Sequence, residues 1–279
     1  MDMPDPEQTN TTMNPSPEAT PRSRVRLHRT ECIVLRRLDL GEADRILTIF
    51  SRERGKLRVV AKGVRKTQSR LAGHLEPFAR TSVLLAEGRN LDIVSQAQMV
   101  DPFRTLRDSE VTIACAGYIA DLLDQLTVEE QPNVVLYEVV IEALNRLDKQ
   151  LDPFITLRWF ELTALRVLGF GIELRRCVGC GKELAPETNA FSPEGGGVVC
   201  AECAPGEPAT LPLSVNGLKL MRLLERDLDR VDRLRFGEGL RREVESIMHV
   251  YIQHLIGREL RSLRVLRLLS EQAEHAAQE

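Results

Sequence analysis

Residues 45–61 read RILTIFSRERGKLRVVA, two short runs rich in β-branched residues on either side of Arg54-Gly55. Apolar and polar side chains alternate in Lys56-Leu57-Arg58-Val59, and Ile46, Thr48 and Phe50 recur at every second position. Period-two alternation of this kind is typical of half-buried strands. The stretch therefore predicts strands over 45–50 and 56–61, joined by a tight turn.

The segments around this pair predict three more strands. Runs of similar composition occupy 32–38, 78–86 and 91–98, and turn residues such as Gly41, Gly63 and Gly88 punctuate them. A polar connection separates the third strand from the fourth. Five short strands in this arrangement fit a small closed barrel of the OB type, and a five-stranded SH3-like barrel fits nearly as well.

After Pro102 the apolar residues recur at helical spacing instead. Helices are predicted over 113–126, 135–147, 157–168 and 215–229, and a long one over about 238–269 with a possible break near Gly257. The fold class is therefore α+β: an N-terminal five-stranded OB-fold barrel followed by an all-helical domain that carries a zinc-binding insert with four cysteines. The predicted divisions are a disordered tail at 1–21, a nucleic-acid-binding barrel at 22–103, a helical domain at 104–270 with its insert at 175–206, and a flexible C-terminus at 271–279.

The charge of the chain is distributed unevenly. The 279 residues carry 38 Lys and Arg against 41 Asp and Glu, but residues 22–105 alone carry 18 bases against 9 acids. A basic block of domain size indicates a polyanion as partner for the barrel. Residues 1–21 lack the basic and apolar regions of a signal peptide, and no apolar run is long enough to cross a bilayer. We expect a protein without membrane association, located in the cytoplasm.

Four of the six cysteines form a C-x2-C-x19-C-x2-C pattern, made of Cys177, Cys180, Cys200 and Cys203. Each C-x2-C pair lets two thiolates converge on one ion, and four thiolates complete a tetrahedron that leaves no position for water. The pattern predicts one structural Zn2+ per chain, although spacing alone does not exclude an iron–sulfur cluster. Residues 191–199 are predicted to form a hairpin that returns the second pair to the first. Cys32 and Cys115 lie in apolar runs and are expected in the core.

Sequence patterns of common enzymes are missing. There is no G-x-x-x-x-G-K-[ST], H-E-x-x-H, G-x-S-x-G or G-x-G-x-x-G. His74-Leu75-Glu76 supplies half of a zinc-deaminase signature, but the P-C-x-x-C half is absent because Arg176 and Val199 precede the two cysteine pairs. We therefore expect no catalytic residues and a protein that acts by binding. A zinc hydrolase or deaminase is the least favoured alternative.

Several motifs, taken in order, resemble RecO, a family of bacterial recombination mediators. The similar segments are Gly41-Glu42-Ala43-Asp44-Arg45-Ile46, Ala61-Lys62-Gly63-Val64-Arg65-Lys66, Leu75-Glu76-Pro77-Phe78, Gly169-Phe170 and Gly257-Arg258-Glu259-Leu260. The resemblance covers about residues 25–269 and includes the cysteine insert. It implies an N-terminal OB-fold, a helical domain with a zinc site, and a role in DNA repair and recombination near the nucleoid.

The resemblance also implies partners. These are single- and double-stranded DNA, whose complementary strands the protein would anneal, and RecR, with which it would help load RecA onto DNA coated by single-strand-binding protein. The alternative is a zinc-ribbon module that binds RNA or associates with transcription.

Basic residues of the barrel are the candidate phosphate contacts. The predicted set is Arg36, Arg37, Lys56, Arg58, Lys62, Arg65, Lys66 and Arg70. Residues 22–105 hold only three aromatic residues (Phe50, Phe78 and Phe103), and the first two are expected in the core. Because stacking on aromatic side chains is then scarce, phosphate contacts should dominate, with weak sequence preference and steep salt dependence.

A second basic group recurs every three residues near the C-terminus, at Arg258, Arg261, Arg264 and Arg267. Leu260, Leu263, Leu266 and Leu269 occupy the other half of the same predicted helix. The arginines are either a solvated face or a site for an acidic peptide with an apolar tip. The resemblance supplies such a peptide, the acidic C-terminal tail of single-strand-binding protein.

Overall fold

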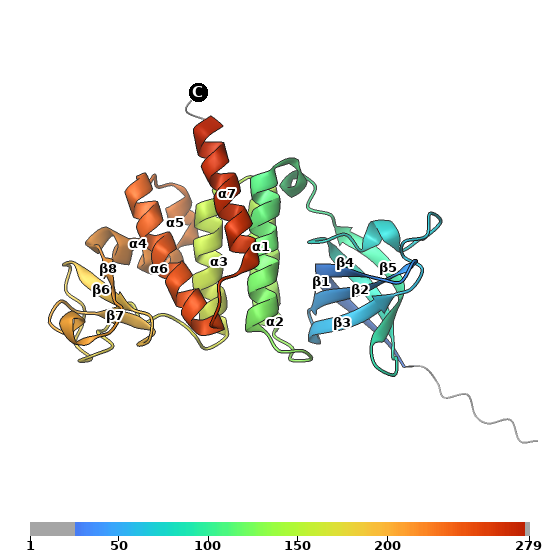
Figure 1. The fold of residues 1–279 in the computed structure, drawn as a ribbon, viewed down its shortest axis with the longest axis horizontal. Coiled ribbons are helices and arrows are strands. Elements are labelled where there is room, and N and C mark those ends of the chain that lie inside the picture. The colour runs from blue at the N-terminus through green and yellow to red at the C-terminus, as the bar shows by residue number, and fades with distance from the viewer. Residues whose placement is uncertain (1–25, 277–279) are drawn as a thin grey trace, which may run out of the picture.

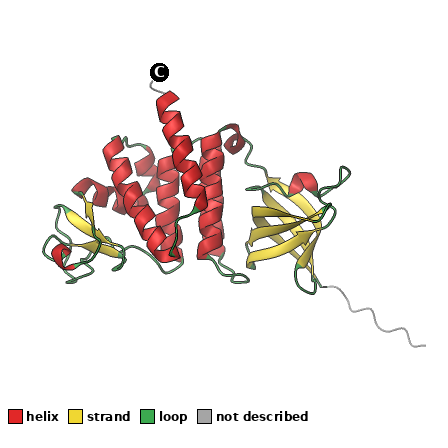
Figure 2. Ribbon diagram, viewed as in Figure 1, coloured by secondary structure: helices red, strands yellow, loops and turns green. Residues whose placement is uncertain are grey.

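Three parts follow one another along the long axis of the molecule: a strand barrel, a group of helices and a small sheet (Figure 1). The structure is a computed structural model, and it describes residues 26–276 without the side chains of Arg267 and residues 270–276. The predicted tail at 1–21 lies outside the described residues. Figure 2 shows that the strands gather at the two ends and the helices lie between them.

The barrel contains the five predicted strands, although β1 begins well before its expected start. They are β1 (Leu27–Leu40), β2 (Asp44–Ser51), β3 (Gly55–Ala61), β4 (Arg80–Ala86) and β5 (Asp92–Asp101). The closed strand order is β1-β2-β3-β5-β4, and β3 pairs with β5 in parallel while the other neighbours are antiparallel. A short 3-10 helix, η1 (Ala72–His74), stands between β3 and β4. Of the two barrel types left open by the sequence, this is the OB topology.

The alternation seen in the sequence places one set of side chains inside the barrel. Val34, Leu47, Ile49, Leu57 and Val59 belong to a buried cluster that fills it. The residues between them point outward, as the two-residue period of a strand requires. Cys32 belongs to the same interior and is fully buried, as predicted.

The helical domain begins after η2 (Thr105–Asp108). Its helices are α1 (Glu110–Leu126), α2 (Val134–Asp148), α3 (Pro153–Val167), α4 (Val215–Arg226), α5 (Leu228–Asp232), α6 (Glu238–Ile256) and α7 (Arg261–Ala276). One continuous core joins them, and Cys115 lies in it as predicted. No helix in residues 26–276 combines the length and the apolar character that a bilayer crossing requires.

Local sequence explains where the helices begin and end. The Asp152 side chain accepts the backbone N–H groups of Phe154 and Ile155 at the start of α3, and Pro153 occupies the first turn. Gly257, at φ +74°, ends α6, which confirms the break expected near it. The single helix predicted over 215–229 is interrupted instead, because the Asp227 side chain caps a separate α5. Helix α7 continues to Ala276, beyond the expected end.

The barrel and the helical domain are packed firmly against each other. Ile33, Leu35 and Phe50 point out of the barrel into the helical core, where the Phe50 and Tyr137 rings lie 6.3 Å apart. A Cβ added to Gly55 would lie 2.0 Å from the backbone oxygen of Gln131, so the β2–β3 turn approaches the α1–α2 loop as only glycine permits. The two domains therefore present their surfaces in one fixed arrangement.

The insert forms a small sheet of its own at the far end of the molecule. The predicted hairpin is present as β6 (Asn189–Ser192) and β7 (Gly197–Val199), and β8 (Leu211–Leu213) adds a third strand to it. The sheet packs on the helices through Phe191, whose ring meets that of Tyr251 edge-on at 5.6 Å. The cysteine insert is thus anchored to the helical domain and distant from the barrel (Figure 1).

Candidate metal centre and nucleic-acid surface

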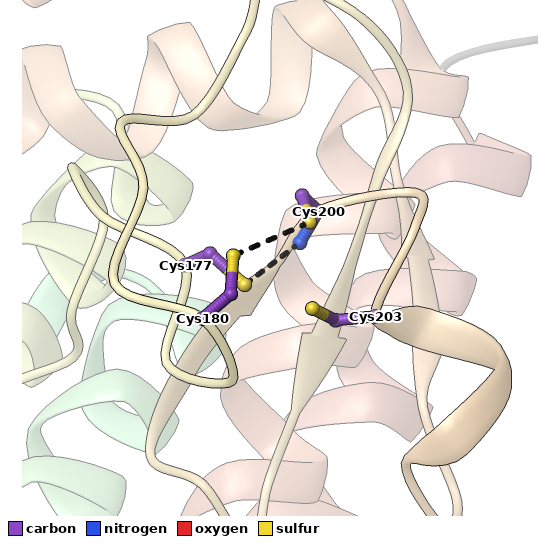
Figure 3. A group of neighbouring side chains, drawn as sticks. All are labelled: Cys177, Cys180, Cys200 and Cys203. Atoms are coloured by element: carbon purple, nitrogen blue, oxygen red, sulfur yellow. Dashed lines mark hydrogen bonds between the residues drawn. The ribbon is translucent and has the colours of Figure 1, made fainter.

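The four predicted metal ligands converge at one point. Cys177 and Cys180 come from the loop before β6, and Cys200 and Cys203 come from the turn after β7 (Figure 3). Their four sulfur atoms all lie within 4.8 Å of one another. Gly179 and Gly181 make the first turn possible: a Cβ at Gly179 would lie 3.2 Å from Cys203 Cβ, and Gly181 has φ +75°.

The dimensions of the group fit zinc. A Zn–S distance of about 2.3 Å in a tetrahedron places the sulfur atoms about 3.8 Å apart. The Sγ atoms of Cys180 and Cys200 are 3.9 Å apart, and the backbone N–H of Cys200 donates to Cys177 Sγ at 3.3 Å. Four thiolates would leave no coordination position open, so the site suits a structural ion. The structure itself shows a group of side chains able to hold a metal ion, and the sulfur donors and their spacing favour zinc.

Electrostatics inside the group also favour a cation. Although burial raises the pKa of Cys177, hydrogen bonds from the backbone N–H groups of Cys200, Cys180 and Gly179 outweigh it and hold that pKa at about 6. The pKa of Cys203 is raised to about 12, because its thiol hydrogen-bonds to Cys200 and Cys180 and lies beside Cys177. Several thiolates cannot share so small a volume without a positive charge among them.

The predicted DNA-binding residues divide into two sets. Arg58, Lys62, Lys66 and Arg70 are exposed and form no ion pair within the described chain. Arg58 lies on the outer face of β3, and the other three follow β3 in the long connection to η1. This half of the predicted set therefore carries free positive charges on β3 and in the connection that follows it.

The other predicted residues carry charges that already have partners. Arg37 pairs with Glu76 at 2.9 Å, and Arg65 donates to the Gly41 backbone oxygen and lies 3.6 Å from Asp39. Arg36 keeps a 68% exposed side chain and only a 3.7 Å approach to Asp124.

Lys56 is buried at the domain interface. Its Nζ donates to the backbone oxygen of Asp124 at 2.5 Å and lies 3.2 Å from the Asp124 carboxylate. Lys56 therefore bridges the two domains and offers no free charge to a phosphate.

Some exposed bases of the barrel do not stand out in the sequence. Arg26, Arg29, Arg89 and Arg104 are exposed and unpaired among the described residues. Arg26 and Arg89 line a polar cavity of about 330 Å³ beside Arg58. These four residues lie in turns or near the start of β1, so no periodic sequence pattern identifies them as a group.

The aromatic residues of the barrel offer no ring for stacking, as expected. Phe50 is fully buried and Phe78 packs against the helical core. Phe103 is 1% exposed. The loop motif His74-Leu75-Glu76 has structural partners too, since His74 Nδ1 accepts the backbone N–H of Met99 and Glu76 binds Arg37.

The described C-terminal arginines do not form one continuous strip. Arg258 precedes α7 and donates to the Gln125 side chain at 2.5 Å, whereas Arg261 and Arg264 are exposed on the helix. The side chain of Arg267 is outside the described residues. The leucines of the opposite half, Leu260, Leu263 and Leu266, are each 5–6% exposed.

A cavity of about 630 Å³ lies beside these leucines, between α1, α3, α6 and α7. Its lining combines apolar side chains such as Phe154 and Leu157 with arginines and acids, which are Arg158, Arg241, Arg242, Arg258, Asp152, Glu238, Glu245 and Glu259. At its deepest side Arg158 donates to Glu161 at 2.5 Å, and Arg158 Nη1 has no hydrogen-bond partner among the described groups. The sequence gives no sign of this cavity of mixed lining, because residues from four helices build it.

Comparison with known proteins agrees with this architecture. The family model described as "Recombination protein O N terminal" matches residues 25–103, and "Recombination protein O C terminal" matches residues 108–264. Together they cover the barrel and most of the helical domain.

Individual relatives are similar over nearly the whole chain. A "DNA repair protein RecO" of Roseiflexus sp. (strain RS-1) is 42% identical over 244 residues, which are 87% of this chain and 86% of that protein. Proteins with the same description from Desulforudis audaxviator (strain MP104C) and Dehalococcoides mccartyi (strain ATCC BAA-2266 / KCTC 15142 / 195) are 38% and 34% identical, over 87% of this chain and 97% and 96% of theirs. The chain therefore belongs to the RecO family of DNA repair proteins.

Proposed function

We propose that this protein is a recombination mediator that binds single- and double-stranded DNA through the basic side of its barrel and anneals complementary strands. The observation that carries the proposal is the group of free bases Arg58, Lys62, Lys66 and Arg70 on and beside β3. Four unpaired positive charges on and directly after β3 suit a polyanion, and OB-folds commonly bind oligonucleotides on the face that contains strands 2 and 3. The protein acts by binding and not by catalysis, in the cytoplasm at the nucleoid.

The absence of exposed aromatic rings from the described barrel supports a mode of DNA binding in which contacts to the phosphates dominate. Phosphate contacts carry no sequence information, so the same surface accepts either strand of a complementary pair. Such tolerance suits a factor that must bind both strands of a complementary pair, whose sequences differ. In the cell the protein would work with RecR to help load RecA onto strands coated by single-strand-binding protein.

The test of the DNA surface is a salt titration with the variant Lys62→Ala/Lys66→Ala/Arg70→Ala. Three lost phosphate contacts should flatten the slope of log K against log salt by about 2 on single strands and slightly more on duplex. Arg226→Ala/Arg230→Ala/Arg233→Ala removes three exposed bases from the helical domain and should leave the slope unchanged. Equal slopes for the wild type and the barrel variant would refute this surface.

We propose further that the insert holds one structural Zn2+ through Cys177, Cys180, Cys200 and Cys203. The spacing of the sulfur atoms supports this. When bound, the ion would lock the two loops together and add its binding free energy to the stability of the insert. It would have no contact with DNA at the barrel, which lies at the other end of the molecule.

The cavity beside α7 supports a partner site for the C-terminal tail of single-strand-binding protein. Leu260, Leu263 and Leu266 supply apolar lining, and Arg258 lies at the same cavity with exposed Arg261 and Arg264 on the helix that follows. An acidic peptide with an apolar end would meet the positive charges of Arg261 and Arg264 on α7 and the leucine side chains of the cavity lining.

Titration of the tail peptide tests this site. Arg261→Glu/Arg264→Glu should weaken peptide binding by about tenfold or more at low salt, because two attractive charges become repulsive. Arg226→Glu/Arg230→Glu makes the same charge change elsewhere and serves as control. Equal peptide affinity for the wild type and the α7 variant would remove the site from the proposal and leave the DNA surface untouched.

A further inference from the structure

Four aliphatic side chains form a row across the outside of the barrel. The strand register pairs Leu38 with Ile46, Ile46 with Val60, and Val60 with Ile93. Residues paired across neighbouring strands point to the same face of a sheet. Leu38, Ile46, Val60 and Ile93 therefore cross four adjacent strands in one line, called the aliphatic row below.

The aliphatic row faces outward and is accessible. Its members alternate with Leu47, Val59 and Val94, which fill the barrel interior. Leu38 is 61% exposed, and the other three members are half-buried. The helical domain covers the other end of this face, around Phe50 and Lys56, and leaves the row open.

Positive charge borders the aliphatic row. The next line of the same register is Arg36–Thr48–Arg58, in which both arginines are exposed. On the other side the register pairs Leu40 with Asp44, whose carboxylate accepts the backbone N–H of Gly63, and exposed Lys62 and Lys66 lie just beyond the end of β3. An apolar line with exposed basic residues on either side is complementary to a single strand, whose bases have apolar faces and whose phosphates are anionic.

We infer that the aliphatic row is a platform for the unpaired bases of single-stranded DNA, with Arg36 and Arg58 holding the adjoining phosphates. This inference rests on the DNA-binding function proposed above and specifies which part of the ligand this face takes. Adjacent strands lie about 4.8 Å apart, so the row spans about 14 Å. Sheets of similar width carry about two or three bases in other single-strand binders.

Aliphatic side chains suit this purpose where aromatic ones are missing. Every base has an apolar face, so an aliphatic surface shields it from water without reading its identity. A duplex keeps its bases stacked inside and can offer this face only its phosphates. The row therefore adds affinity for a single strand alone, and the basic borders serve both kinds of DNA.

The experiment uses the full-length protein with three ligands of equal phosphate number: a thymine oligomer, an abasic oligomer and a duplex. The variant Leu38→Thr/Val60→Thr removes apolar surface and keeps residues that favour strands. The control Leu27→Thr/Val100→Thr makes the same two exchanges at exposed positions of the barrel outside the row. Thermal unfolding of each variant shows whether the barrel is intact.

The wild type should bind the thymine oligomer more tightly than the abasic one. Leu38→Thr/Val60→Thr should weaken binding of the thymine oligomer about five- to tenfold and change binding of the abasic oligomer and the duplex by less than about twofold. The control variant should match the wild type on all three ligands. An unchanged affinity for the thymine oligomer, or an equal loss on all three ligands, would overturn the platform. Failure of the wild type to bind any of the three would refute the proposed DNA-binding function itself, which is a separate outcome.

Discussion

Lys56 and Arg58 show how two bases on one strand and one face acquire different roles. They are two residues apart on β3, yet Lys56 is buried against Asp124 of α1 and Arg58 stands free in solvent. Alternation along the strand predicts that both point outward, and this is confirmed. Which of them meets the helical domain depends on contacts with residues that are distant in the sequence, which a local pattern does not contain.

Exchanging each of these residues for methionine separates the two roles. Lys56→Met keeps the aliphatic stem but leaves Asp124 with only the more distant, exposed Arg36 as cation, so the free energy of unfolding should fall by about 1–3 kcal/mol. Arg58→Met should leave stability within about 0.5 kcal/mol and weaken DNA binding, because it removes an exposed phosphate contact. Urea unfolding and a DNA titration of both variants measure this. A loss of stability in Arg58→Met together with a loss of DNA binding in Lys56→Met would contradict the structure.

A buried acid in the helical domain gives a second prediction at this scale. Burial raises the pKa of Glu161 to about 7, even though Arg158 and the Tyr118 hydroxyl favour its charged form. In the unfolded chain the pKa of a glutamate is about 4.3, so between these values the folded state binds the additional proton. Stability contributed by this group is present at low pH and is lost as the pH rises from about 4.5 to about 7, by about 3 kcal/mol.

Glu161→Gln should remove this part of the pH dependence. The variant is expected to be less stable at every pH, because Arg158 loses its countercharge. The quantity to compare is therefore the slope of the unfolding free energy against pH, and not its value at one pH. Urea unfolding at several pH values between about 4.5 and about 7.5 measures both proteins across the range in which the group titrates. Parallel profiles for the wild type and Glu161→Gln would show that Glu161 is not the titrating group.

At the scale of elements, pattern and punctuation predict most of the fold. Apart from the earlier start of β1, the five strands, the first three helices and the hairpin between the cysteine pairs lie close to their expected bounds. The pattern fails for single residues, where local spacing alone does not decide whether a side chain is buried or exposed. Ile113 and Val135 share the helical spacing of core residues, yet they are 40% and 61% exposed, because the neighbouring helices cover only part of α1 and α2. Asp232 lies among alternating acids and bases, a pattern typical of a solvated helix face, yet it binds the buried Arg146 at 2.5 Å.

The candidate sites also differ in how far they could be predicted from the sequence. The convergence of the four cysteines could be predicted, since two short pairs joined by a hairpin specify their own geometry. Which basic residues of the barrel keep a free charge could be predicted only in part, because half of them have acidic or backbone partners, such as Glu76 for Arg37, that are distant in sequence. The cavity beside α7 could not be predicted, because its walls come from helices whose packing the sequence pattern does not reveal.

Replacement of one exposed cysteine tests the metal centre. Cys180 is exposed, so without a metal Cys180→Ser would change stability by no more than about 0.5 kcal/mol. With a structural ion, the variant should lose its zinc, and the insert should unfold at lower temperature, because metal binding contributes folding free energy. Metal analysis of the purified protein should give about one zinc per chain, and Cys115→Ser should retain it. Full zinc content in Cys180→Ser would contradict the assignment.

At the scale of the whole molecule, the candidate DNA-binding surface and the candidate metal centre are far apart. The basic barrel lies at one end, the cysteine insert at the other, and the helical core joins them (Figure 1). Hydrogen-bonded and apolar contacts fix the barrel to the helices, including Lys56 with Asp124 and Arg52 with Glu138 at 3.0 Å. A strand held at the barrel therefore keeps a constant position relative to the cavity beside α7. This arrangement suits a protein that must hold DNA while it contacts a protein already bound to the same DNA.

The most direct test of the proposed mediator function is the annealing of complementary strands precoated with single-strand-binding protein, with and without RecR. The wild type should accelerate annealing well above the spontaneous rate, and Lys62→Ala/Lys66→Ala/Arg70→Ala should lose most of the acceleration while it remains folded. A wild type that leaves the annealing rate at its spontaneous value, or a barrel variant that anneals as fast as the wild type, would contradict it.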